Sequence, residues 1–170
     1  MSLANTVPHM GGEIDPRKFR NVLGQFCTGL TVVTSMTDGA PTGFTCQSFS
    51  SLSLDPPLVV LCPSKSSTTW PRIRNSGRFC VNILADHHET LSDKFSVSGG
   101  DKFTDIEFGS SPSGSPLLPD ALAWLDCSVH AEYDGGDHSI VVGRVHALDA
   151  VSDSRPLLFH RGRYARTAEQ

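Results

Sequence analysis

Short runs of β-branched and aliphatic residues recur along the chain, separated by segments rich in Gly, Pro, Asp and Ser. Runs of this length and composition are typical of β-strands. We expect strands at 30–36, 58–62, 79–84, 121–133, 138–149 and 157–164. Turn residues connect some of these runs directly, so the pattern predicts two hairpins, one over 30–49 and one over 121–149.

Three short segments have the spacing of helices instead. The first starts at Asp15-Pro16, because Asp is a good helix cap and Pro suits the first helical turn. The apolar residues that follow at helical spacing are Phe19, Val22, Leu23 and Phe26. This segment is therefore expected to be an amphipathic helix.

The second helix is expected to be capped by Ser66 or Ser67 and to be stopped by Gly77. The third is expected to begin at 86–89, where Asp and Glu have the spacing of a capping box, and to end near Phe95.

Residues 96–102 and 112–119 have the composition of loops. Hairpins dominate the predicted order, and strands do not alternate regularly with helices. The pattern therefore favours a mainly β fold, an antiparallel barrel with a few short peripheral helices.

One stretch, 42–68, is unusually rich in hydroxyl groups. Polar residues precede the apolar run 58–62 at Thr42, Thr45, Gln47, Ser48, Ser50, Ser51 and Ser53, and a second polar cluster follows it at Ser64–Thr68. Such an arrangement suits a large planar ligand with an anionic tail. The same pattern is also found in a Ser-rich hairpin that binds no ligand. The spacing of the polar residues alone favours this second interpretation.

Length and charge narrow the classes of function. A chain of 170 residues fits one domain, expected at 15–165, with tails at 1–14 and 166–170. The net charge is −4 and no basic stripe is present, which argues against a nucleic-acid partner. No apolar run approaches the roughly 20 residues of a membrane helix, so no membrane partner is expected.

The five cysteines contain no C-x-x-C pair, and no signal-peptide core precedes them. An odd number of such thiols indicates reduced cysteines and a cytoplasmic protein. A reactive thiol at Cys46 is the less favoured alternative, because no activating base lies beside it in the sequence.

Several familiar motifs are absent, namely G-x-G-x-x-G after a strand, G-x-x-x-x-G-K-[ST] and G-x-S-x-G. The pair His87-His88 is expected to be a solvated helix start and not a metal site, because adjacent helical residues point in different directions. Two features stay open on the residues alone. Arg161 and Arg163 suit either a solvated strand end or an anion contact, and His138 is either structural or placed to meet a ligand.

Several stretches taken in order resemble the flavin reductase-like family, the FMN-binding split barrels. The matching stretches are FRNVLGQFCTGLTVVT (19–34), GFTCQSFSSLSLDPPLVVLCPSKSSTTW (43–70), GRFCVNIL (77–84), DKF (101–103), GSPLL (114–118), GGDHSIVVGRV (135–145) and PLLFHRGRY (156–164). Within the family, the chain is most similar to reductase components of two-component flavin-dependent monooxygenases of the actinobacterial steroid-degradation type. Many members have Asn where this chain has Gln47, which leaves the choice between FMN and FAD open.

The resemblance implies roles for named residues. Residues expected to line the flavin ring and its ribityl chain are Gln47, Ser48, Phe49, Ser50, Ser51 and Ser53. Residues expected to hold the phosphate are Ser64, Lys65, Ser66, Ser67 and Thr68. Asn82 and the loop containing Lys102 and Phe103 are expected near the flavin. Residues expected to contact NADH or NADPH are His138, as the catalytic candidate, and Arg161, Gly162, Arg163 and Tyr164.

The resemblance also implies an activity. We expect a homodimeric NAD(P)H:flavin oxidoreductase that reduces FMN or FAD by hydride transfer and supplies a separate monooxygenase. The cofactors carry that chemistry, and the protein orients them. A flavin-binding electron carrier without useful turnover is the alternative.

Overall fold

The computed structural model describes residues 13–150 and 153–168, and seven antiparallel strands form its main sheet. In chain order these strands are β2 (Thr31–Thr37), β3 (Ala40–Cys46), β4 (Ser50–Leu54), β5 (Pro57–Leu61), β6 (Arg78–Ile83), β9 (Ala123–Gly135) and β10 (His138–Ala150). Their order in the sheet is β3-β2-β6-β9-β10-β5-β4. The prediction of a mainly β, antiparallel fold is confirmed.

Two small sheets accompany the main one. The first contains β1 (Thr28–Gly29), β11 (Leu158–His160) and β12 (Arg163–Ala165), and the second pairs β7 (Gly109–Ser110) with β8 (Pro116–Leu117). Strands β11 and β12 form a hairpin. The predicted single strand at 157–164 is therefore wrong, because Arg161 and Gly162 both have positive φ angles and reverse the chain there.

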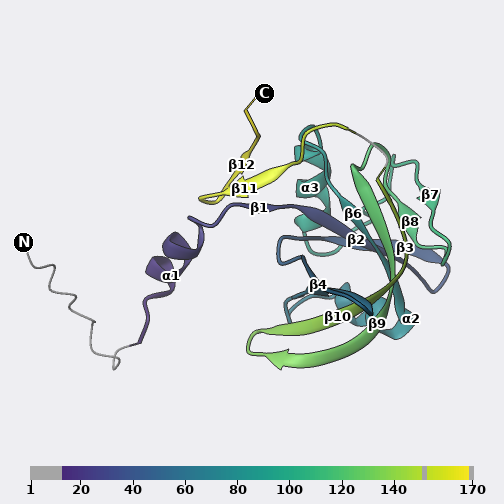
Figure 1. Ribbon diagram of the computed structural model, residues 1–170, viewed down its shortest axis with the longest axis horizontal. Helices are drawn as coiled ribbons and strands as arrows, with labels where there is room; N and C mark the ends of the chain where they lie inside the picture. The colour runs from purple at the N-terminus through teal and green to yellow at the C-terminus, as the bar shows by residue number, and fades with distance from the viewer. Residues whose placement is uncertain (1–12, 151–152, 169–170) are drawn as a thin grey trace, which may run out of the picture.

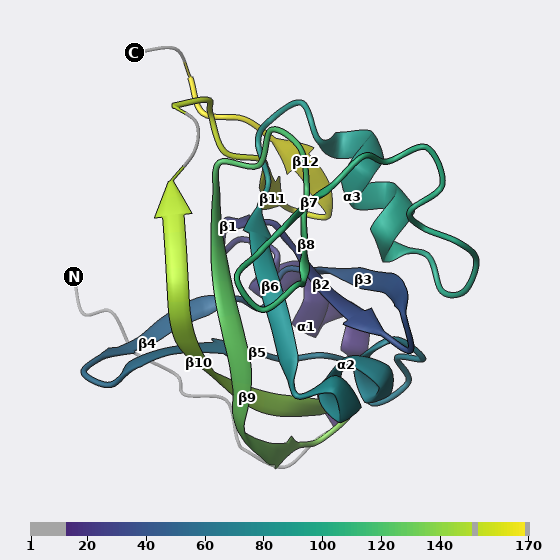
Figure 2. The same cartoon turned by 90° about the vertical axis from the view of Figure 1, so that its right-hand side faces the viewer.

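The main sheet curls until its two outer strands approach each other. Strands β3 and β4 lie at opposite edges of the sheet, yet only residues 47–49 connect them. Four Cα steps span at most about 14 Å, so the two edges must lie close together at this corner. Figure 2 shows the curled sheet with β9 and β10 bending strongly across it. Irregularities at Val142/Gly143 and Val145/Ala147 in the β9–β10 pairing add to the bend.

Side chains on both faces of the central strands are buried. Val33, Phe79 and Leu61 belong to one core cluster, and Val32 belongs to another. Successive residues of a strand point to opposite faces, so β2 contributes to both clusters. The barrel interior and the layer under α3 are therefore packed independently on the same strands.

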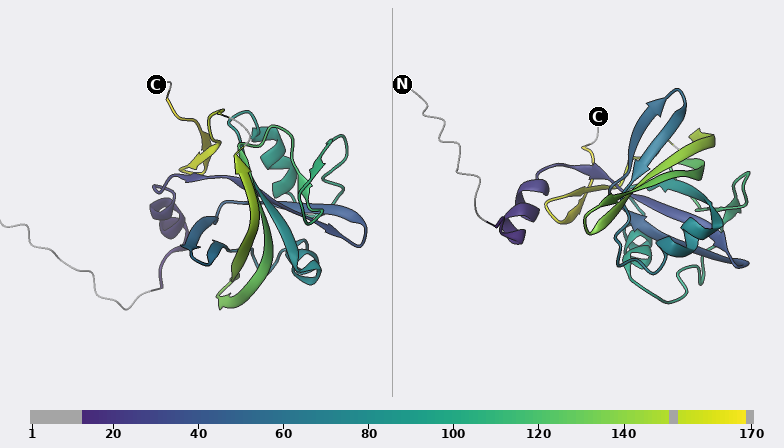
Figure 3. Two further views of the ribbon diagram at one scale, coloured as in Figure 1. Left: turned by 45° about the vertical axis from the view of Figure 1, so that its right-hand side comes forward. Right: turned by 90° about the horizontal axis from the view of Figure 1, so that it is seen from below.

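Three helices occur in the described residues, α1 (Pro16–Leu23), α2 (Trp70–Ser76) and α3 (Glu89–Ser96). Helix α2 closes the first core with Trp70 and Ile73, and α3 covers the second with Phe95. Helix α1 stands clear of the barrel in several views (Figures 1 and 3). It has no buried residue, although the side chain of Asp15 caps it as the sequence predicted.

The starts of α2 and α3 differ from the predictions. Thr69 precedes α2, while the hydroxyl of Ser67 accepts the Trp70 N–H at 3.1 Å, so the helix begins later than expected. The predicted capping box before α3 is wrong. His88 occupies the cap position, and the carboxylate of Asp86 instead lies 3.2 Å from Nε of Arg155.

The predicted loop at 112–119 contains β8, and the tail predicted at 1–14 lies mostly outside the described residues. None of the helices in the described part of the chain has the length and apolar character needed to cross a membrane.

Candidate functional site

A groove follows the corner where the edges of the curled sheet approach each other. Its central pocket has a volume of about 360 Å³ and collects side chains from the end of β3, from the segment after β5 and from the segment after α3. The polar residues that line it are Thr45, Gln47, Ser48, Ser64, Ser66, Ser67, Thr68, Thr69, Ser96, Ser98, Lys102 and His138. The structure thus brings together eight of the residues that the resemblance assigns to the site.

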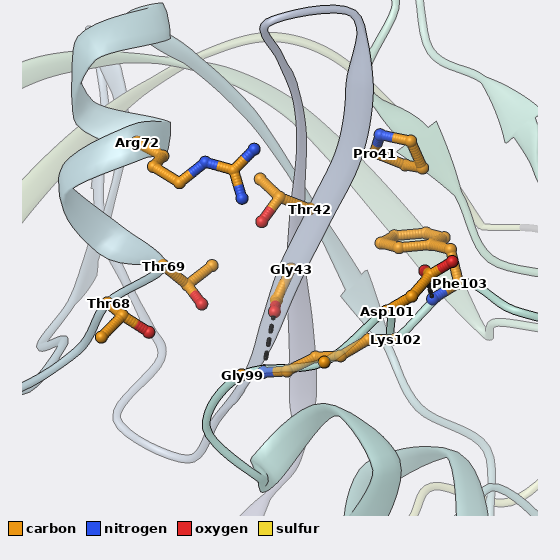
Figure 4. Close-up of a pocket in the computed structure, with 11 residues that line it drawn as sticks. Pro41, Thr42, Gly43, Thr68, Thr69, Arg72, Gly99, Asp101, Lys102 and Phe103 are labelled. Carbon is orange, nitrogen blue, oxygen red and sulfur yellow. Dashed lines mark hydrogen bonds between the residues drawn. The ribbon is translucent and has the colours of Figure 1, made fainter.

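A second pocket opens off the central one beside α2. We call it the Arg72 pocket; it has a volume of about 260 Å³ and shares Thr68, Thr69 and Lys102 with the central pocket. Figure 4 shows the Arg72 guanidinium directed into it. Phe103 also lines this pocket, so the predicted Lys102-Phe103 loop does lie beside the groove.

A third pocket, the Arg163 pocket, lies at the other end and has a volume of about 490 Å³. It shares Thr45, Gln47 and Ser96 with the central pocket, and Gly162 and Tyr164 line its far side together with Arg163. The three pockets thus adjoin one another through shared residues, from the Arg72 pocket to the hairpin β11–β12, and together form the groove.

His138 reaches the central pocket because the segment after β5 pairs with the start of β10. Ser64 and His138 form an antiparallel bridge, and the Ser139 N–H donates to the carbonyl of Pro63 at 3.0 Å. Nδ1 of His138 lies 2.8 Å from Oδ1 of Asp137, which fixes one ring nitrogen and leaves the other for a ligand. Backbone pairing thus joins two segments that are more than 70 residues apart.

Some of the hydroxyl groups after β5 form hydrogen bonds within the loop itself. The hydroxyls of Ser64 and Ser66 lie 2.8 Å apart, and that of Ser67 accepts the N–H groups of Thr69 and Trp70 at 3.2 and 3.1 Å. This loop is held in shape by its own side chains, which positions the remaining hydrogen-bonding groups toward the pocket.

Ser48 fixes the other wall of the central pocket. Its hydroxyl accepts the N–H of Cys62 at 2.9 Å and donates to the carbonyl of the same residue at 3.0 Å. Cys46 lies beneath it and is buried, and burial raises the pKa of the Cys46 thiol. A reactive thiol at Cys46 is therefore not supported.

The two lysines of the predicted site differ in their partners and in their position relative to the groove. Nζ of Lys65 pairs with the carboxylate of Asp134, so its charge is already compensated. Nζ of Lys102 donates to the carbonyls of Gly43 at 3.2 Å and Phe95 at 2.9 Å, and burial lowers the pKa of this ammonium. Lys102, and not Lys65, lines the groove.

The serines at the end of the first polar run lie outside the groove. Ser50, Ser51 and Ser53 belong to β4, and none of them lines the three pockets. The Ser50 hydroxyl donates to the carbonyl of Ser51, and Phe49 packs against the first core. Of the six residues expected to line the flavin ring and its chain, Gln47 and Ser48 line the central pocket.

Asn82 lies in the protein interior and not beside the groove. Its amide donates to the carbonyl of Val32 at 3.2 Å and to the hydroxyl of Thr34 at 3.1 Å. Its carbonyl accepts the N–H of Leu118 at 2.9 Å. Asn82 lines none of the three pockets, and its polar atoms hold β2, β6 and the segment after β8 together.

Residues of the segment 161–164 make contacts in two different places. Nε of Arg161 donates to Oε1 of Gln25 at 2.8 Å, so this arginine joins the hairpin β11–β12 to the chain just after α1. The hydroxyl of Tyr164 donates to Oδ1 of Asp93 at 2.6 Å, at the edge of the groove.

His88 corrects another prediction. It is buried and not solvated, its Nδ1 accepts the Ala85 N–H at 3.1 Å, and burial lowers the pKa of its imidazole. The histidine is part of the packing at the start of α3.

Sequence reasoning missed Arg72 and Thr69, which line the groove from α2 and its cap. The sequence does not distinguish Arg72 from Arg74. Neither arginine has an Asp or Glu three or four residues away, yet Arg74 lies 3.9 Å from Glu132.

Comparisons with known proteins agree on one family. The sequence model described as "Flavin reductase like domain" matches residues 23–168. The chain is 52% identical over 151 residues to the flavin-dependent monooxygenase reductase subunit HsaB of Rhodococcus jostii, covering 89% of this chain and 77% of that protein. It is 41% identical over 160 residues to the FMN reductase (NADH) SmoA of Agrobacterium fabrum, covering 94% and 90%.

A solved structure from Mycobacterium thermoresistibile, named nitrilotriacetate monooxygenase component B, is also similar. It is 51% identical in sequence and superposes with a TM-score of 0.87, covering 89% of this chain and 86% of that one.

Proposed function

This chain belongs to the flavin reductase-like family, and from that premise we propose that it is an NADH:flavin oxidoreductase that supplies reduced flavin to a separate monooxygenase. The observation that carries the proposal is the continuous groove, which joins Gln47 and Ser48, the hydroxyl loop after β5, and His138. The names of the relatives agree with this activity and with NADH as the donor.

The groove suits a flavin by its chemistry. Gln47 and Ser48 can line a planar ring at the corner of the sheet, while the loop 64–68 presents hydroxyls for a phosphate. Lys102 adds a positive charge near the same end. An uncharged planar region next to a hydroxyl-rich, cationic end matches a flavin ring with its phosphate-bearing chain.

We assign His138 to the nicotinamide nucleotide. It lines the central pocket together with Gln47 and Ser48, and one of its ring nitrogens is held by Asp137. The reaction transfers a hydride from the nicotinamide to the flavin, so the protein needs to align the two rings more than to move protons. This fits a groove without an acid–base triad.

We also propose that two copies of the chain form a homodimer. Helix α1 projects from the barrel (Figure 1), and its apolar residues are left open, with Phe19 at 51% and Leu23 at 56% exposure. An apolar helix face of this kind is stabilised by covering it. Because Arg161 ties the chain after α1 to the hairpin at the Arg163 pocket, a second copy on α1 would lie next to the groove.

The cytoplasmic location predicted from the cysteines stays part of this proposal. All five cysteines are free thiols in the structure, as expected in a reducing compartment.

Steady-state NADH oxidation with and without added FMN or FAD tests the proposal. After extensive dialysis, the rate should rise with added flavin and saturate. Cytochrome c behind a dialysis membrane should become reduced, because reduced flavin leaves the protein. If the dialysed protein keeps its full rate without added flavin and nothing crosses the membrane, a tightly held electron carrier becomes the better description.

Light scattering tests the dimer separately. The measured mass should be about twice the 18.3 kDa of the chain. The double variant Phe19→Asp/Leu23→Asp should shift the protein toward the monomer, since two charges would then lie on the face to be covered.

A further inference from the structure

The Arg72 pocket lies where a ligand longer than FMN would continue. It opens off the central pocket at Thr68, Thr69 and Lys102, the end at which the proposed function places the flavin phosphate. FMN ends at that phosphate, whereas FAD continues with a second phosphate and an adenosine. A chain that continues past the first phosphate on this side enters the Arg72 pocket.

The pocket carries positive charge that the protein leaves uncompensated. Within residues 13–150 and 153–168, no carboxylate lies within ion-pair distance of Arg72, whereas Arg74 on the same helix lies 3.9 Å from Glu132. Figure 4 shows Arg72 pointing toward Thr42 across the pocket. Lys102 has three ammonium protons and gives two of them to backbone carbonyls, so one remains for a ligand.

The opposite end of the pocket is less polar. Pro41 and Phe103 lie on the side away from Arg72 (Figure 4), and the Phe103 ring is buried against Phe95 at a centroid distance of 5.0 Å. Gly43 lines the same pocket and adds no side chain to its wall. A flat wall beside an apolar rim suits a planar base.

Asp101 is the carboxylate among the lining residues, and it is already engaged. Its Oδ1 accepts the N–H of Phe103 at 2.9 Å, at the end of the pocket away from Arg72. Its negative charge therefore lies apart from the position that Arg72 and Thr69 define for a phosphate.

We propose that the Arg72 pocket binds the second phosphate and the adenosine of FAD, so that this protein prefers FAD to FMN. The proposal rests on the proposed function and adds the identity of the flavin. Arg72 is then a specificity-determining residue, because its planar guanidinium donates two parallel hydrogen bonds to a phosphate that FMN does not have.

Flavin titrations of the wild-type protein and of Arg72→Ala, Arg72→Lys and Arg74→Ala test this. We expect the wild type to bind FAD more tightly than FMN. Arg72→Ala should weaken FAD binding about tenfold, the usual size for a lost charge-assisted hydrogen bond, and leave FMN binding within about twofold. Arg72→Lys should recover part of the loss, and the matched control Arg74→Ala should change neither flavin.

AMP, which carries the second phosphate and the adenosine alone, gives an independent measurement. It should compete with FAD for the wild-type protein but not with FMN. Both results together support the proposal.

Three outcomes overturn it. Equal weakening of FMN and FAD by Arg72→Ala would place Arg72 at the phosphate that both flavins share. Unchanged flavin binding with a raised KM for NADH would assign the pocket to the nicotinamide nucleotide. Unchanged binding of all ligands would leave the pocket without this role, while the proposed reductase activity would stand. Failure of the wild type to bind any flavin would instead end both proposals.

Discussion

Two polar regions of this protein have similar compositions and opposite roles. Around Asn82, amide and hydroxyl groups lie in the interior between β2, β6 and β8, and each of them is satisfied by a neighbouring protein group. In the groove, Gln47 and Thr68 are exposed at a corner where the sheet edges meet. The difference shows that a polar residue is available for a ligand only where its hydrogen-bond donors and acceptors are not already satisfied by other groups of the protein.

The largest effect is expected from Asn82→Ala. Removing this side chain leaves the N–H of Leu118 and the buried oxygens of Val32 and Thr34 with fewer partners, and we expect a loss of about 2–4 kcal/mol in unfolding free energy. Denaturant unfolding measures it, with Asn75→Ala on the surface of α2 as the control. Flavin affinity of the folded variant should be unchanged; a stable variant that loses its flavin would return Asn82 to the site.

Lys102→Ala should have the next largest effect, but on binding. The loss of a charged donor at the phosphate end should weaken flavin binding by about 1.5–3 kcal/mol in a fluorescence titration. Lys94→Ala is a matched control, because Lys94 also donates to a backbone carbonyl, that of Thr104, and lies outside the groove. Equal losses for both variants would indicate an effect on folding and not on the ligand.

His138→Ala should affect NADH more than flavin. We expect a fall in kcat/KM for NADH that corresponds to about 0.5–1.5 kcal/mol of lost transition-state stabilisation, the size of one neutral hydrogen bond. Flavin affinity should stay nearly constant. His146→Ala on the same strand is the control, since its ring bonds the Ser128 hydroxyl at 2.8 Å on another part of the sheet. An unchanged kcat/KM would remove His138 from the nicotinamide site.

The smallest effect is expected from Lys65→Ala. Its ammonium is exposed and paired with the still more exposed carboxylate of Asp134, so we expect it to contribute little to stability or to flavin affinity. Flavin titration in low and high salt measures this directly. If Lys65→Ala weakened flavin binding more than Lys102→Ala, the assignment of the two lysines would be reversed.

The comparison also explains which predictions succeeded. The strands and hairpins of the main sheet follow from local runs of β-branched residues and from Gly-containing turns, and the structure confirms both predicted hairpins. The resemblance to the flavin reductase-like family is confirmed as well. These features depend on residues that are close together in the sequence or on several motifs in a fixed order.

The failures depend on partners that are distant in the sequence. Asp86 does not cap α3 because Arg155 pairs with it. Lys65 pairs with Asp134, 69 residues away, a contact that no local pattern in the sequence indicates. The turn at Arg161 was missed because a non-glycine residue with φ near 52° is uncommon and has no strong local signal.

The three-residue connection between β3 and β4 has a consequence for the order of folding. The local hairpins β2–β3 and β4–β5 can form early, but their strands end at opposite edges of the finished sheet. Strands β6, β9 and β10, from residues 78–150, must insert between them before the edges meet. Pairing between segments so distant in the chain is slow because their loops must close first. The groove is therefore assembled at the end of folding, and nascent chains released before residue 150 has been made cannot bind flavin.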